Sequence, residues 1–163
     1  VGCKTASVSG FFALPSKPGF DSIHLGDVLE HLPNPSETLL QLLDYLRPGG
    51  VLFVEGPLEI NHSLVYHFAR SLGFIKKLLK QENINNHPPT HMYRTSAKQQ
   101  LAFIERLDTE LECKVWEIYE TGWPYIDGGT IKRIIARIAV ALGGRSCLGS
   151  TFGNRFKGIF VKS

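Results

Sequence analysis

Three side chains that can bind a metal ion or move a proton stand close together near the start of the chain. Asp27 and Glu30 are three residues apart, and Asp27 and His31 are four apart, so a helical turn would place all three on one face. Two carboxylates and one imidazole suit magnesium, manganese or zinc. Alternatively, a neutral His31 accepts a proton from a hydroxyl nucleophile, or Glu30 and His31 only anchor a loop.

A second polar cluster lies in the loop predicted for residues 81–95. It contains His87, His91 and Tyr93, and the two histidines are close enough in the chain to converge. A third ligand at a fixed spacing is missing, so we assign no metal site here. The cluster either recognises a ligand or is a solvated loop before a helix that Thr95 or Ser96 caps.

Aromatic residues gather late in the chain, at Trp116, Tyr119, Trp123 and Tyr125. In a strand, side chains alternate between the two faces of the sheet, so Trp116 and Tyr119 point to opposite sides. Packing in the core and at the sheet edge is the favoured role for this group. The alternative is that these rings form a wall of a ligand pocket.

A helix predicted after Gly129 carries both an apolar stripe and a basic side. The stripe consists of Ile131, Ile134, Ile135, Ile138 and Leu142, and the basic side of Lys132, Arg133 and Arg137. We expect the basic side to be solvated. Contact with a membrane surface is the alternative.

The elements around the first cluster form a strand–helix–strand unit. A buried strand over 20–25 leads into a short helical turn over 27–32, which Pro33 stops. Asn34 or Ser36 caps the next helix, whose leucines continue to Leu46 before residues 48–50 turn the chain. Residues 51–54 form an apolar strand, as expected where helices cover both faces of a sheet. The unit implies parallel strands, with ligands beyond their carboxyl ends.

The remaining pattern completes a single α/β domain over residues 1–163. The predicted elements are a short strand within 1–9, a helix over 63–79 interrupted near Gly73, a helix over 96–107, and strands over 113–121 and 156–161. A length of 163 residues is typical of one domain.

Composition excludes several classes of protein. A net charge of +3 is too small to indicate nucleic-acid binding. No apolar run is long enough to cross a membrane, and the first residues lack the order of a signal peptide, so we expect a cytoplasmic protein. The three cysteines, Cys3, Cys113 and Cys147, are far apart and are expected to be reduced thiols.

Two segments, "DVLEHLPNP" at 27–35 and "LRPGG" at 46–50, resemble class I S-adenosylmethionine-dependent methyltransferases, in particular the ubiquinone-biosynthesis type of O-methyltransferase. The resemblance is specific over residues 20–57. It implies a doubly wound, Rossmann-like sheet with one antiparallel strand among the last, and S-adenosylmethionine as cofactor. It places the cofactor along Leu25, Gly26, Asp27 and Leu29.

The resemblance also implies a reaction, namely methyl transfer to a small acceptor, with oxygen as the expected target atom. Asp27 and His31 are then the catalytic candidates, with a divalent cation as a further option. His87, His91 and Tyr93 match a segment that this family places near the acceptor. One rival is a domain that keeps the fold without binding the cofactor. Another is a nucleotide-dependent oxidoreductase, disfavoured because no G-x-G-x-x-G follows a strand.

The family's Gly-rich turn and ribose-binding acid are not found before Phe20, so we expect the sheet to lack its first two strands. The 163-residue chain is then expected to bind S-adenosylmethionine weakly or not at all. For the remaining strands the resemblance implies the order 20–25, 51–54, 156–161 and 113–121. This order leaves 20–25 at an edge that the N-terminal segment, a second copy or another protein covers.

Overall fold

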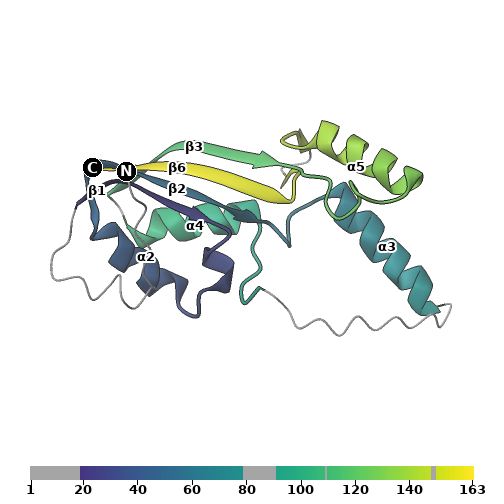
Figure 1. Ribbon diagram of the computed structural model, residues 1–163, viewed down its shortest axis with the longest axis horizontal. Helices are drawn as coiled ribbons and strands as arrows, with labels where there is room; N and C mark the ends of the chain where they lie inside the picture. The colour runs from purple at the N-terminus through teal and green to yellow at the C-terminus, as the bar shows by residue number, and fades with distance from the viewer. Residues whose placement is uncertain (1–18, 79–90, 109, 148–149) are drawn as a thin grey trace, which may run out of the picture.

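The computed structural model describes residues 19–78, 91–108, 110–147 and 150–163. A four-stranded sheet crosses these residues in the order β1-β2-β6-β3 (Figure 1). The strands are β1 Phe20–Gly26, β2 Leu46–Pro57, β6 Arg155–Lys162 and β3 Leu111–Tyr119. β1 and β2 are parallel, whereas β6 is antiparallel to both β2 and β3. The predicted strand order and the antiparallel strand are therefore confirmed. The segment 1–9 lies outside the described residues.

Two of the helices begin at the predicted caps, Asn34 and Ser96. The helices of the described residues are the 3-10 turn η1 Leu29–His31, α2 Pro35–Leu43, α3 Leu64–Leu78, α4 Ala97–Leu107 and α5 Thr130–Leu142; β4 Ser146–Cys147 and β5 Ser150–Thr151 form a separate small ladder. The Asn34 side chain accepts a hydrogen bond from the backbone N–H of Glu37. Ser96 and Gln99 form a reciprocal capping box at the start of α4.

Helix α2 is shorter than the leucine pattern predicts. It ends at Leu43, and Leu46 already begins β2, where it pairs with Phe20 of β1. The residues predicted to turn the chain, 48–50, instead belong to an irregular first part of β2 in which Gly49 has a φ of 72°. Leu46 is buried as a strand residue. A leucine stripe does not distinguish the last turn of a helix from such a residue, because both are apolar positions facing a core.

The main core lies between the sheet and the layer formed by α2 and α4, which cover the same face (Figure 1). Leu39 and Leu43 of α2 and Ile104 of α4 pack with sheet residues such as Leu52 and Phe160. Within the described residues, burial alternates along β2, and Phe53 faces away from this core. The expectation that helices cover both faces of this strand therefore fails for the part of the chain that the structure describes.

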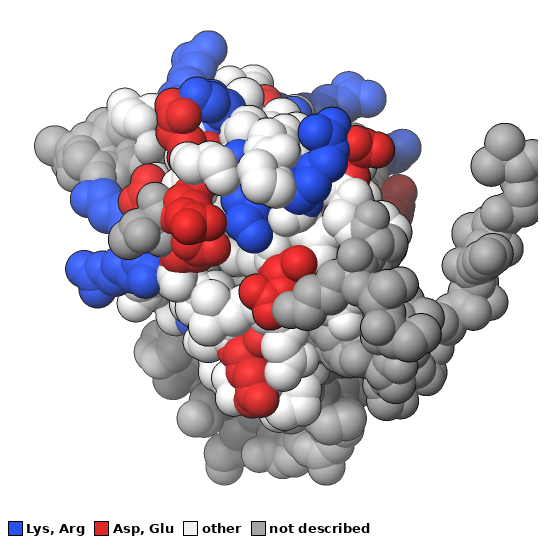
Figure 2. Space-filling model, turned by 90° about the vertical axis from the view of Figure 1, so that its left-hand side faces the viewer, with Lys and Arg blue, Asp and Glu red and all other residues white. Residues whose placement is uncertain are grey.

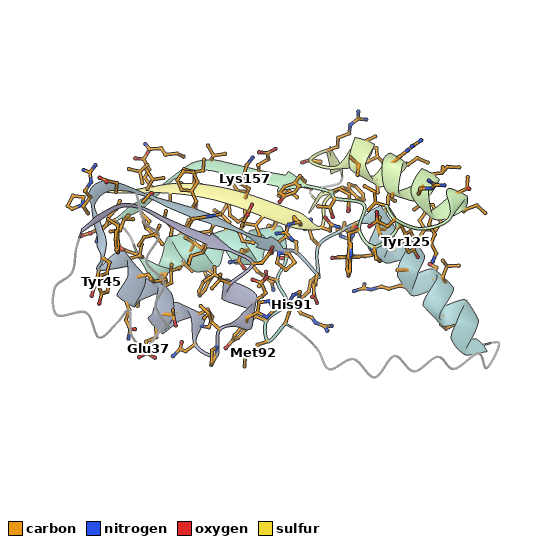
Figure 3. The ribbon with its side chains drawn as sticks, in the orientation of Figure 1. Glu37, Tyr45, His91, Met92, Tyr125 and Lys157 are labelled. Atoms are coloured by element: carbon orange, nitrogen blue, oxygen red, sulfur yellow. The ribbon has the colours of Figure 1, made fainter. Side chains whose placement is uncertain are left out.

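Helices α3 and α5 extend beyond the carboxyl ends of β1 and β2 and pack on each other (Figure 1). Val65 of α3 and Ala136 and Ala139 of α5 surround the buried ring of Tyr125 (Figure 3). Helix α3 is continuous through Gly73, which contradicts the predicted interruption. None of the helices within the described ranges combines the length and apolar character that crossing a bilayer requires.

Candidate active site

The loop after β1 places Asp27 at the end of the sheet. Asp27 has a φ of 51°, in the left-handed region that few residues other than glycine, asparagine and aspartate adopt. Its carboxylate accepts a hydrogen bond from Arg155, the first residue of β6, at 2.6 Å. The prediction that Asp27, Glu30 and His31 share one helical face is wrong, because η1 begins only at Leu29.

The predicted cofactor-contact residues differ in what they offer a ligand. The side chains of Leu25 and Leu29 are buried in the core, so only their backbone is available at the surface. Gly26 follows Leu25 as the last residue of β1, where an added Cβ would lie 3.2 Å from a carboxylate oxygen of Glu55. A larger side chain at position 26 would therefore require the Glu55 carboxylate to shift by a few tenths of an ångström.

Glu30 joins the loop after β1 to the segment that contains His91. Its backbone carbonyl accepts hydrogen bonds from the N–H groups of Met92 at 2.8 Å and Tyr93 at 3.4 Å. The residue is only 8% exposed, and its Oε1 has no hydrogen-bond partner among the residues that the structure describes. Burying an unpaired carboxylate oxygen is costly, so this atom needs a partner when the site is occupied.

The imidazole rings of His31 and His91 contact each other next to this carboxylate. Their ring centroids are 4.9 Å apart in an edge-to-face arrangement. One ligand atom from each of Glu30, His31 and His91 lies within 4.8 Å of the other two. The cluster in the structure therefore consists of Glu30, His31 and His91. His91, from the second predicted cluster, takes the place that the sequence pattern gave to Asp27.

Glu59, which follows β2, orients His91. Its Oε1 contacts Nδ1 of His91, and its Oε2 accepts from Arg94 at 2.8 Å. An ionised carboxylate can only accept, so Nδ1 of a neutral His91 carries the proton and Nε2 remains a free acceptor. Glu59 is not among the site residues predicted from the sequence, although its position two residues beyond the end of a strand was an available signal.

These groups line an open cleft of about 540 Å³ at the carboxyl ends of β1 and β2. Its lining also includes Pro57, Tyr66, Thr121, Trp123, Asn154 and Arg155. Burial, reinforced by the nearby carboxylates of Glu59 and Glu120, raises the pKa of Tyr66. Its hydroxyl is therefore a neutral hydrogen-bond donor at pH 7.

The second predicted cluster is divided by the structure. His91 lines the cleft, whereas the Tyr93 hydroxyl donates to the Pro33 carbonyl at 2.7 Å, and its ring borders a separate cavity of about 250 Å³. His87 lies outside the described residues. Of the late aromatics, Trp116 stacks on Phe156 in the core, as the packing role predicts, and Trp123 lines the cleft.

Comparison with known proteins identifies the family. A family model described as a methyltransferase domain matches residues 4–103. The chain belongs to this family of S-adenosylmethionine-dependent methyltransferases. Over 95 residues it is 33% identical to a ubiquinone biosynthesis O-methyltransferase of Shewanella pealeana, a match that covers 58% of this chain and 37% of that methyltransferase. The matched region is thus little more than a third of that relative's length.

Solved structures agree on the methyltransferase fold. A SAM-dependent methyltransferase from Archaeoglobus fulgidus matches 98% of the chain and 66% of its own length, with a TM-score of 0.52 and 17% identity. The [4+2]-cyclase SpnF matches 98% of the chain and 54% of its own, with a TM-score of 0.51 and 15% identity. At these identities the likeness shows the fold alone, and the chemistry has to be argued from the cleft.

Proposed function

We propose that this methyltransferase domain transfers a methyl group from S-adenosylmethionine to a hydroxyl oxygen of a small acceptor bound in the cleft. The cofactor supplies an electrophilic methyl group on a sulfonium sulfur. The observation that carries the proposal is the pairing of His31 and His91 at the strand ends, each beside a carboxylate. An imidazole next to a carboxylate is suited to take the proton that a hydroxyl loses on methylation.

His91 is the better placed of the two histidines to accept that proton. Glu59 fixes its tautomer and would stabilise the positive charge that forms on the ring. Within the described part of the chain His31 lacks a comparable partner, because its Nε2 is 3.9 Å from Oε1 of Glu30, beyond hydrogen-bond distance. We therefore assign proton transfer to His91 and acceptor positioning to His31, which reverses the roles expected from the sequence.

The residues after β1 fit the cofactor by their backbone. Gly26 and Asp27 leave the strand end without a bulky side chain, and Asp27 is held in place by Arg155. We place the methionine part of the cofactor along Leu25, Gly26 and Asp27, with Leu29 supporting this loop from the core. In-line placement of the methyl group and the acceptor oxygen then accounts for most of the catalysis.

A divalent cation bound by Glu30, His31 and His91 is a second candidate role for the same groups. The unpaired, buried Oε1 of Glu30 favours it, because a cation would satisfy that atom. Two imidazoles and one carboxylate suit zinc or manganese. A bound cation would lower the pKa of an acceptor hydroxyl.

Transfer of a labelled methyl group tests the proposal. The protein is incubated with millimolar labelled S-adenosylmethionine and a panel of hydroxylated acceptors, and the label in the product is counted. We expect His91→Ala to lower turnover by about 10²-fold or more, the usual contribution of a general base. His31→Ala should have a smaller effect, and Cys113→Ala, away from the cleft, none. Full activity in His91→Ala would contradict the assignment.

A further inference from the structure

Helix α5 turns its isoleucines outward. Ile131 is 75% exposed, and Ile134 and Ile138 are each 52% exposed, while the small side chains of Ala136 and Ala139 face the interior. The spacing of the three isoleucines puts them on one stripe of the helix. An exposed row of large β-branched residues on a helix marks a surface that contacts something apolar.

The apolar stripe continues into the loop before α5. Trp123 is 62% exposed, and Ile126 is also exposed. The loop is attached to α5 through Tyr125, whose ring is buried against Ala136 and Ala139. The Trp123 and Ile126 side chains therefore belong to the same rigid unit as the Ile stripe. Trp123 also lines the cleft, so this surface reaches the entrance of the candidate active site.

The segment that carries the stripe is basic. Residues 121–145 contain the four cations Lys132, Arg133, Arg137 and Arg145 and the single acid Asp127. This segment alone thus has the net charge of +3 that the whole chain has. At the opposite end of the molecule, acidic and basic side chains are interspersed (Figure 2).

We infer that α5 and its preceding loop bind the surface of an anionic lipid bilayer. The Ile stripe and Trp123 would enter the headgroup region, where apolar side chains and tryptophan are favoured. Arg133 and Arg137, adjacent to the stripe on the helix, would extend to lipid phosphates. Charge complementarity selects this occupant, because a second copy of the same basic surface would bring like charges together.

Co-sedimentation with vesicles tests this inference. The protein is mixed with vesicles of equal parts phosphatidylglycerol and phosphatidylcholine, or of phosphatidylcholine alone, at about 0.1 M salt, where charges interact over about 10 Å. We expect partitioning to be at least tenfold stronger with phosphatidylglycerol. In a Trp116→Phe variant, Trp123 is the only tryptophan, and its emission should shift to shorter wavelength on these vesicles.

Two pairs of variants separate the apolar and the electrostatic contributions. Ile134→Ser/Ile138→Ser should lower partitioning by about tenfold or more, since each isoleucine loses its apolar burial. The matched control is Leu40→Ser/Val115→Ser, which changes exposed apolar residues of α2 and β3. Arg133→Gln/Arg137→Gln should weaken binding to a similar degree, whereas Lys98→Gln/Arg106→Gln on α4 should not. All four pairs change exposed side chains, and thermal unfolding checks that each variant is folded.

Three results would overturn the inference. The first is equal partitioning to both kinds of vesicle. The second is vesicle binding by Ile134→Ser/Ile138→Ser that matches the unaltered protein. The third is a dimer in size-exclusion chromatography that this variant converts to a monomer, without vesicle binding by either form.

Discussion

Nη2 of Arg155 lies 2.6 Å from Oδ1 of Asp27, although the two residues are 128 positions apart in the chain. Asp27 follows β1, Arg155 begins β6, and β2 lies between these strands. Nε of Arg155 also donates to the Tyr119 hydroxyl at the end of β3, at 3.2 Å. Burial alone would lower the pKa of Arg155, but the hydrogen bonds to Tyr119 and Asp27 raise it overall. One guanidinium thus connects three strand ends at the cleft.

Breaking this ion pair should affect activity more than stability. We expect Asp27→Asn to lower methyl transfer at least tenfold, because the loop after β1 loses its link to β6. Asparagine tolerates the left-handed backbone of position 27, so the free energy of unfolding should fall by only about 0.2–1 kcal/mol. Steady-state turnover and urea unfolding measure the two effects.

Asp21→Asn is the matched control for that variant. Asp21 pairs with Arg47 at 2.5 Å, at the far end of β1 and away from the cleft. This control should leave turnover unchanged. An equal loss of activity in both variants would remove Asp27 from the site.

The proton-transfer assignment predicts that activity survives chelation. Turnover in excess EDTA should equal turnover without it, since His91 and Glu59 need no cation to accept a proton. Loss of activity in EDTA that magnesium or manganese restores would instead favour the cation role of Glu30, His31 and His91. His24→Ala is the control for a histidine outside the site, because His24 pairs with Glu55 and does not line the cleft.

The environment of Tyr66 predicts a pH dependence of stability. Its pKa in the folded chain is raised above the ordinary value of 10.0, chiefly by burial. Above pH 10 the unfolded chain loses the phenol proton first, so the folded state holds more protons and stability falls as pH rises. The free energy of unfolding of Tyr66→Phe should therefore decline less steeply above pH 10. The free energy of unfolding is measured by urea titration at each pH. If it declined equally steeply above pH 10 in both proteins, the prediction would be refuted.

The capping box of α4 predicts a local stability effect. Ser96→Ala removes the acceptor of the Gln99 N–H and should cost about 1 kcal/mol. Ser71→Ala is a fair comparison, because the Ser71 hydroxyl donates to a carbonyl within α3 and caps nothing. Thermal denaturation should show a clear decrease for the first variant and little for the second.

The sheet could be predicted from sequence because its determinants are local and strong. The apolar runs located the strands, and Asn34 and Ser96 located the starts of α2 and α4. The order β1-β2-β6-β3 followed from the resemblance to the methyltransferase family. The end of α2 could not be predicted. A buried leucine at position 46 satisfies a helix and a strand equally, and only the pairing of Leu46 with Phe20 decides between them.

Only part of the candidate site could be predicted from the sequence. Spacing along the chain grouped Asp27 with Glu30 and His31. In the structure, Asp27 itself has a left-handed backbone conformation before η1, and its carboxylate pairs with Arg155. The fold then brings His91 into its place through hydrogen bonds to the Glu30 carbonyl. Contacts between residues far apart in the chain produce no periodic pattern in the sequence. The apolar stripe of α5 does not mark its buried side. The isoleucines lie on the outer side of the helix, and the closely packed inner side has alanines instead.

A titration with S-adenosylmethionine, followed by the amide resonances of the chain, tests the central claim most directly. Weak binding with a dissociation constant on the order of 1 mM remains visible by this method, and corresponds to about 4 kcal/mol. We predict that the largest shifts occur at Leu25, Gly26, Asp27 and Leu29, with smaller ones around His31 and His91 and none on α5. The absence of shifts in residues 25–31 at several millimolar cofactor, or shifts confined to other parts of the chain, would contradict the proposal.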